Sequence, residues 1–166
     1  MAQSAARSLL QTVWGERGFP VDPIWIANQL GIKVIHAKLD PAVSGAIIKD
    51  AGKDPVIVLS ETDSKVRRRF TCAHELGHYA QRVTQGDVDQ YDFVDLRGPD
   101  AASGSSPDER FANQFAACLL MPEEEVRRLH DDGVPAVAMA AHFGVSGEAM
   151  SIRLNRLRLV ALPQEA

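Results

Sequence analysis

The chain has 166 residues, which is enough for one domain with a core of its own. Apolar residues make up 45% and charged residues 24%, a globular composition that excludes a disordered, collagen-like or coiled-coil chain. The net charge is −4, so the chain as a whole is not suited to coating nucleic acid or anionic lipid. Two of its five histidines, His74 and His78, fall within five residues of each other.

The first part of the chain predicts two helices followed by strands. Residues 2–16 have helical composition, and Asp22 with Pro23 forms an N-cap and a first helical position for a short second helix. Three apolar runs separated by turn residues then predict a small antiparallel meander of three strands. The predicted strands are residues 32–36, 43–49 and 55–59.

A long helix is predicted over residues 63–83, with Ser60 or Thr62 as its cap. Apolar residues repeat on one side of it at spacings of three and four, and Leu76 and Cys72 lie on the other side. A helix that is apolar on both sides is usually buried in its middle. The two histidines and the glutamate inside this helix therefore require an explanation.

The rest of the chain predicts a long connection and then a series of helices. Residues 84–106 form the connection, with a short strand possible at 91–96, and a connection of this length is a reasonable place for a lid. A helix is expected over residues 107–120, ended before Pro122. Shorter helices are expected at about residues 122–131, 134–143 and 146–157.

The sequence His74-Glu75-Leu76-Gly77-His78 matches the pattern H-E-x-x-H. On a helix, His74 and His78 lie one turn apart and about 40° apart around the axis, so both imidazoles can reach one ion. Glu75 projects to the side, where it can act on a water molecule as a general base without ligating the metal. The alternative is a buried histidine pair beside a glutamate without a metal.

A catalytic zinc site uses three protein ligands, so a third must come from elsewhere in the chain. Glu109, near the start of the next long helix, is the candidate, and Asp108 is the second choice. Asn113 lies four residues after Glu109 on the same helix face, where it can hydrogen-bond a ligand histidine and fix its tautomer. Small residues beside this face, Ala112 and Ala116, allow the two helices to approach closely.

Glu109 has a second interpretation, because Ser106-Pro107-Asp108-Glu109 also has the pattern of a capping box. In that arrangement Ser106 is the N-cap and the Glu109 side chain returns to the backbone of Ser106. The H-E-x-x-H upstream favours ligation over the cap.

Two stretches resemble the ImmA/IrrE family of metallopeptidases. The first runs from Arg69 to Tyr79 and contains the H-E-x-x-H; the second runs from Glu109 to Ala116 and is followed by Leu119-Leu120-Met121-Pro122. The order and spacing of elements are similar from about residue 22 to residue 159. Phe111 stands where the family often has a second acidic residue, which leaves Glu109 unaffected.

The resemblance implies an α+β, zincin-like fold: a small three-stranded sheet, an HExxH helix and a second, ligand-bearing helix. It implies His74, His78 and Glu109 as metal ligands and Glu75 as the catalytic base. We expect a single domain over residues 1–166, with a metallopeptidase core at about 22–122 and a C-terminal helical segment at about 123–160 packed on it. No residue that stabilises the oxyanion can be chosen among Tyr79, Tyr91, His130 and His142.

The C-terminal helices also resemble a helix-turn-helix, with Gly144-Val145-Ser146 as the turn. Arg153, Arg156 and Arg158 lie on or just after its second helix, but three arginines on an acidic chain give few phosphate contacts. Direct DNA binding is therefore not expected. A basic run at residues 65–69 has two interpretations, a solvated helix face or a docking surface for an acidic partner.

These observations predict a metal-dependent endopeptidase, with zinc as the expected ion and manganese or iron also compatible with the donors. The resemblance implies regulatory cleavage of a helix-turn-helix repressor or antitoxin-like protein partner. The alternative is a non-proteolytic transcriptional regulator or partner-binding module with a structural or sensory metal. A cytoplasmic location without membrane contact is expected, because no signal peptide or membrane-spanning run is seen and Cys72 and Cys118 have the pattern of buried thiols.

Overall fold

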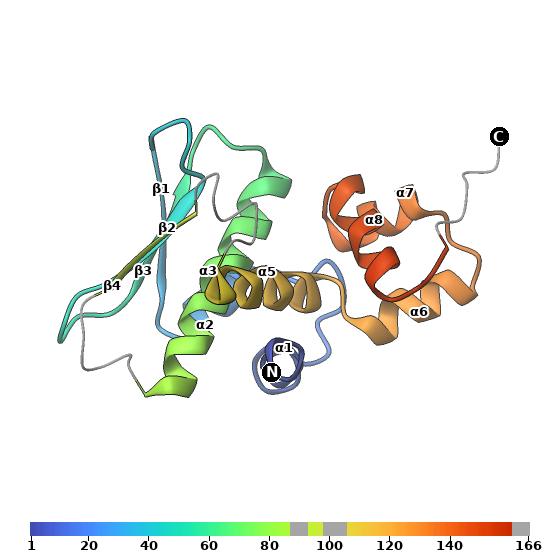
Figure 1. The fold of residues 1–166 in the computed structure, drawn as a ribbon, viewed down its shortest axis with the longest axis horizontal. Coiled ribbons are helices and arrows are strands. Elements are labelled where there is room, and N and C mark those ends of the chain that lie inside the picture. The colour runs from blue at the N-terminus through green and yellow to red at the C-terminus, as the bar shows by residue number, and fades with distance from the viewer. Residues whose placement is uncertain (87–92, 98–105, 161–166) are drawn as a thin grey trace.

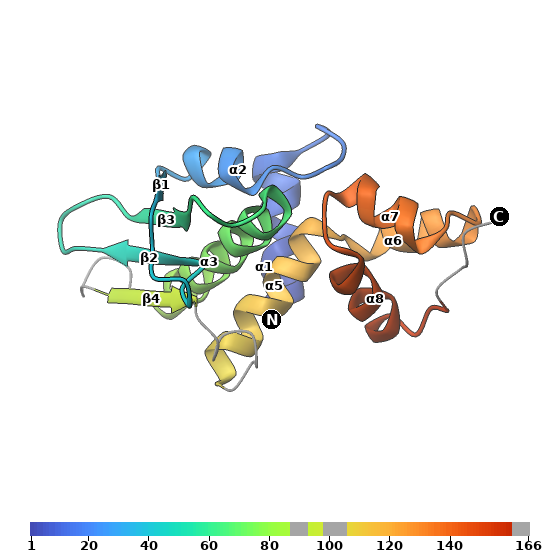
Figure 2. The same ribbon diagram turned by 90° about the horizontal axis from the view of Figure 1, so that it is seen from above.

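The computed structural model describes residues 1–86, 93–97 and 106–160, and its helices and strands are shown in Figures 1 and 2. The N-terminal elements are α1 (Ala2–Leu9), the π-helix η1 (Leu10–Trp14), α2 (Pro23–Gln29), β1 (Lys33–Ala37), β2 (Gly45–Lys49) and β3 (Val56–Ser60). They are followed by α3 (Lys65–Gln85), β4 (Phe93–Arg97), α5 (Pro107–Leu120), α6 (Glu123–Asp131), α7 (Ala136–Phe143) and α8 (Gly147–Arg156). The predicted α+β class is confirmed.

The three predicted strands are present, but their predicted arrangement as an antiparallel meander is wrong. The strand order is β1-β3-β2-β4, with β1 parallel to β3 and β2 antiparallel to β3. Alternating apolar residues determine which face of a strand is buried, but they do not determine which strand lies beside it. Here β2 and β3 form a hairpin, and the chain of β1 occupies the outer edge of β3.

The sheet has a fourth strand, β4, which pairs antiparallel with the other edge of β2. Its residues 93–97 overlap the short strand expected at 91–96, whose first two residues lie outside the described residues. The proposed lid at 84–106 lies for the most part outside them as well.

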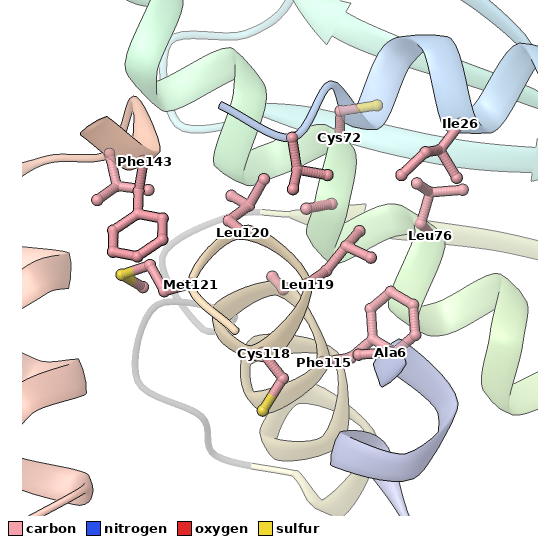
Figure 3. Close-up of a cluster of buried hydrophobic side chains, with 14 of the residues drawn as sticks. Ala6, Ile26, Cys72, Leu76, Phe115, Cys118, Leu119, Leu120, Met121 and Phe143 are labelled. Atoms are coloured by element: carbon pink, nitrogen blue, oxygen red, sulfur yellow. The ribbon is translucent and has the colours of Figure 1, made fainter. Parts of the chain in front are cut away.

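The elements are arranged in layers (Figures 1 and 2). Helix α3 packs on the sheet, α5 packs on α3, and α6, α7 and α8 lie on the side of α5 away from the sheet. Ile47 and Ile57 are partners in the sheet and both are fully buried. The core continues through Leu76 of α3 and Phe115 of α5, which lie in the same buried cluster (Figure 3).

Two glycines allow the layers to approach closely. A Cβ on Gly45 of β2 would lie 2.5 Å from Cγ2 of Thr71 on α3, so only glycine lets the helix lie this near the sheet. A Cβ on Gly77 of α3 would lie 2.9 Å from Cα of Ala112 on α5. The predicted close approach of these two helices at a small residue is therefore confirmed.

The start of α3 differs from the sequence prediction, which named Ser60 or Thr62 as its cap. Ser64 is the N-cap, and its hydroxyl accepts a hydrogen bond from the backbone N–H of Arg67 at 3.2 Å. Ser60 ends β3, and its hydroxyl lies 3.0 Å from that of Thr62. These two side chains therefore hydrogen-bond each other before the helix begins, and neither caps it.

The basic run at the start of α3 forms contacts inside the fold that sequence reasoning missed. Arg67 donates two hydrogen bonds to the hydroxyl of Ser44, at 2.9 and 2.7 Å. Arg69 donates to the backbone carbonyls of Val21, Phe143 and Gly144. Its half-buried guanidinium thereby joins α3 to the chain before α2 and to the end of α7.

Both cysteines, Cys72 and Cys118, are buried free thiols, as predicted. Among the described residues, the structure has no helix that is both long enough and apolar enough to cross a membrane.

Candidate metal centre

Two histidines of α3 form one side of the site. His74 and His78 are 0% and 4% exposed, in the part of α3 that is enclosed by the sheet and α5. Their Nε2 atoms lie 3.1 Å apart, with the ring centroids 4.8 Å apart. The one-turn spacing of the H-E-x-x-H therefore directs both imidazoles to one point.

Glu109 approaches the same point from the first turn of α5. Its Oε2 lies 3.2 Å from Nε2 of His74, and its Oε1 lies 3.1 Å from Nε2 of His78. Ser106 caps the helix by accepting a hydrogen bond from the backbone N–H of Glu109 at 3.1 Å. The cap therefore positions Glu109, while its carboxylate points to the histidines.

These three residues fit a metal ion. One ligand atom from each lies within 4.8 Å of the other two, and such atoms around a tetrahedral zinc ion lie about 3.3 Å apart. Oε2 of Glu109 is buried and makes no hydrogen bond within the described part of the chain. A buried carboxylate oxygen without such a bond is costly, and a cation between the three groups would compensate it.

Asn113 of α5 holds the His74 ring in orientation. Its Oδ1 lies 2.9 Å from Nδ1 of His74, so Nδ1–H of the imidazole donates to the amide oxygen. In that tautomer Nε2 of a neutral His74 keeps its lone pair, which faces Glu109 and His78. The position predicted for Asn113, one helical turn after Glu109, produces this contact.

Glu75 lies on α3 between the two histidines and is 0% exposed. It does not belong to the group of three possible ligands. Burial raises the pKa of the neighbouring Cys72 thiol, and the charge of Glu75 raises it further. Cys72 is therefore an inert thiol. The Glu75 carboxylate, buried beside the three possible ligands, is suited to proton transfer.

The other candidate residues do not join this cluster. Asp108, the second choice as a ligand, is exposed, and its Oδ1 accepts a hydrogen bond from Nε2 of Gln81 at 2.8 Å. His142 binds the carboxylate of Glu125, and His130 binds the carbonyl of Val160.

The two tyrosines among the candidates for oxyanion stabilisation are not part of the cluster in the described residues. Tyr79 is half-buried and packs against the core, and Tyr91 lies outside the described residues. Sequence reasoning found no direct sign of the role of Gly77. Its place inside the H-E-x-x-H, together with the small residue Ala112 on the next long helix, is the signal that could have indicated the contact between α3 and α5.

An HExxH helix on a small open sheet, with a carboxylate supplied by a second helix, fits a zincin-like protein with a metal centre. Residues 27–155 match the family model of the IrrE N-terminal-like domain, peptidase family M78. The chain therefore belongs to this metallopeptidase-type family, as its resemblance to ImmA/IrrE proteins implied.

A Mycobacterium tuberculosis transcriptional regulator has a similar structure, with a TM-score of 0.63 and 18% sequence identity. The match covers 98% of this chain and 48% of that chain, so the present chain spans about half the length of the regulator. At this identity the likeness shows a shared fold alone. No curated protein matches the chain.

Proposed function

We propose that the chain is a metal-dependent endopeptidase with His74, His78 and Glu109 as the metal ligands and Glu75 as the general base. The observation that carries this proposal is the buried convergence of two imidazoles and one carboxylate beside a second buried carboxylate. Zinc suits these donors best, and Mn²⁺ or Fe²⁺ accepts the same set.

In the proposed peptide hydrolysis, Glu75 and Asn113 have different roles. A bound zinc ion would bring the pKa of a water ligand toward neutrality and polarise the scissile carbonyl. Glu75 takes a proton from the attacking water and then passes it to the nitrogen of the leaving amine, so its carboxylate is regenerated. Asn113 keeps the His74 tautomer that presents Nε2 to the site.

The substrate that we propose is a helix-turn-helix repressor or antitoxin-like protein. Its support is the family membership together with the resemblance of both motifs to ImmA/IrrE peptidases. We further propose that the chain reaches its substrate as a cytoplasmic protein and without binding DNA itself. The support for the absence of DNA binding is the net charge of −4, because a chain that binds DNA usually presents an excess of positive charge.

A second candidate function is transcriptional regulation without proteolysis, with the metal in a structural or sensory role. The observation that favours it is the structural similarity to a protein named as a transcriptional regulator. This alternative requires the metal ligands but gives Glu75 no role in proton transfer.

The two candidates are separated by metal analysis and a cleavage assay. Protein purified without added metal is expected to contain about one divalent ion per chain and to cleave a candidate repressor until a chelator is added. E75Q is expected to keep the ion and lose cleavage by about 10²–10⁴-fold. E61Q, which changes an exposed glutamate in the same way, is the matched control and should cleave normally.

Cleavage by E75Q at the rate of the parent would refute the general-base role. DNA binding that persists in E75Q, without cleavage of any repressor tested, would favour the regulator.

A further inference from the structure

A pocket on the side of the molecule away from the sheet is rich in arginine. It has a volume of 330 Å³ and lies between the start of α1, α6 and the end of α8. The residues of the pocket that matter here are Gln3, Glu123, Arg127, Arg153, Arg156 and Arg158. Four guanidinium groups thus meet one carboxylate on a chain whose net charge is −4.

Arg153 lies at the base of this arginine pocket. It is 6% exposed, and its Nε–H donates to the backbone carbonyl of Met121 at 3.0 Å. Its Nη2 is also buried, and its guanidinium is hydrogen-bonded to the side chain of Cys118. These contacts fix the Arg153 side chain in place, so its positive charge is held at the base of the pocket.

The charge of the pocket is not balanced by its own carboxylate. Glu123 binds Arg127 at 2.8 Å and also accepts a hydrogen bond from Gln3. Arg156 and Arg158 are exposed and form no ion pair with any residue that the structure describes. The backbone of Arg158 has a φ of 57°, a left-handed conformation that costs energy for a residue other than glycine.

We propose that the arginine pocket binds an oxyanion, namely the phosphate group of a small molecule or free phosphate. The planar guanidinium presents paired N–H donors that match the oxygens of phosphate, and several together favour a multiply charged anion. Arg153 also lines a second cavity of 640 Å³ that contains Leu10, Trp14 and Phe19. An organic phosphate therefore has room for an apolar part beside its charged group.

This site is separate from the metal centre. None of the residues that line the pocket belongs to the group formed by His74, His78 and Glu109. In Figures 1 and 2, α6 and α8 lie on the far side of α5 from the sheet. The proposal therefore goes beyond peptide hydrolysis and stands whether or not the chain cleaves a substrate.

The test is an NMR titration of the whole chain with inorganic phosphate and with phenyl phosphate at constant ionic strength. A chelator is present throughout, so that phosphate cannot bind a metal at His74 and His78. The Nε–H resonance of Arg153, assigned by its loss in R153K, is expected to shift and saturate.

R156Q and R158Q, both exposed and outside the core, are each expected to weaken the affinity about tenfold. K38Q removes a positive charge from an exposed site by the sheet and should leave the affinity unchanged. Tighter binding of phenyl phosphate would identify an organic phosphate as the ligand, and equal binding would identify free phosphate.

Absence of a saturable shift with either probe, or equal weakening in K38Q and R156Q, would overturn the proposal.

Discussion

Gly77 is the position where a single added carbon would test how the fold builds the metal centre. In G77A the new Cβ would lie 2.9 Å from Cα of Ala112, 3.2 Å from its carbonyl oxygen and 3.2 Å from Cβ of Phe115. Carbon atoms in contact are most stable about 3.5–4.0 Å apart, so α3 and α5 must separate by roughly 0.5 Å or more. Two of these neighbours are backbone atoms of Ala112 and the third is the Cβ of Phe115, and none of them can rotate away.

Two effects of opposite sign determine the stability of G77A. Alanine favours a helix over glycine by about 1 kcal/mol, whereas overpacking a tight contact costs about 1–3 kcal/mol. G147A is the matched control, because Gly147 begins α8 and a Cβ there meets nothing within 4 Å. We expect G77A to unfold about 2 kcal/mol more easily than G147A, which corresponds to a melting temperature roughly 4–8 °C lower.

The same displacement affects the site, because Glu109 is carried by α5 and the histidines by α3. Metal affinity in G77A is expected to fall by about tenfold, since the ligand atoms no longer converge. Thermal melting of the chelated protein and titration with Zn²⁺ measure the two effects separately. If G77A matches G147A in both measurements, the close contact of α3 and α5 does not position the ligands.

Three further variants test other parts of the structure. N113A removes the acceptor for Nδ1–H of His74 and is expected to lower the metal affinity about 10–100-fold in a Zn²⁺ titration. Unchanged affinity would show that the His74 ring is held by other contacts. R69M leaves the carbonyls of Val21, Phe143 and Gly144 without the donor that Arg69 supplies. Denaturant unfolding should therefore show a free energy of unfolding about 3 kcal/mol lower than that of the parent. A decrease below about 1 kcal/mol would contradict the anchoring role of Arg69. The hydrogen bond from Arg128 holds the pKa of Glu125 below its usual value, with His142 adding to the effect, so Glu125 stabilises the fold above its ordinary pKa and this stability is lost as the pH falls through its folded pKa. E125Q should therefore be less stable than the parent by up to about 1 kcal/mol at pH 7, and this difference should shrink as the pH is lowered in melting experiments. A difference that stays constant with pH would contradict the electrostatic reason.

Much of the local structure followed from the sequence. The helix α5 begins after Ser106 with Pro107 at its first position and ends before Pro122, as the capping and breaking residues predicted. The one-turn spacing of His74 and His78 fixed their common direction as soon as the segment was helical. The three predicted strands also formed, because their apolar runs contain residues that bury well in a sheet.

Other features depended on contacts between distant segments. The neighbours of β1 could not be predicted, because an apolar pattern gives the buried face and not the pairing partner. The basic run gave no indication that Arg69 donates to carbonyls more than 70 residues further along the chain. Arg153 resembled Arg156 and Arg158 in sequence, yet of these three arginines only Arg153 is buried.

The metal centre depends on both the local sequence and the tertiary structure. The sequence by itself determined the histidine pair, the adjacent Glu75 and the two candidate carboxylates Asp108 and Glu109, because helical spacing is a local property of the chain. The tertiary structure decided between the carboxylates: consecutive residues point about 100° apart on a helix, and the packing of α5 on α3 turns Glu109 toward the histidines and Asp108 toward Gln81.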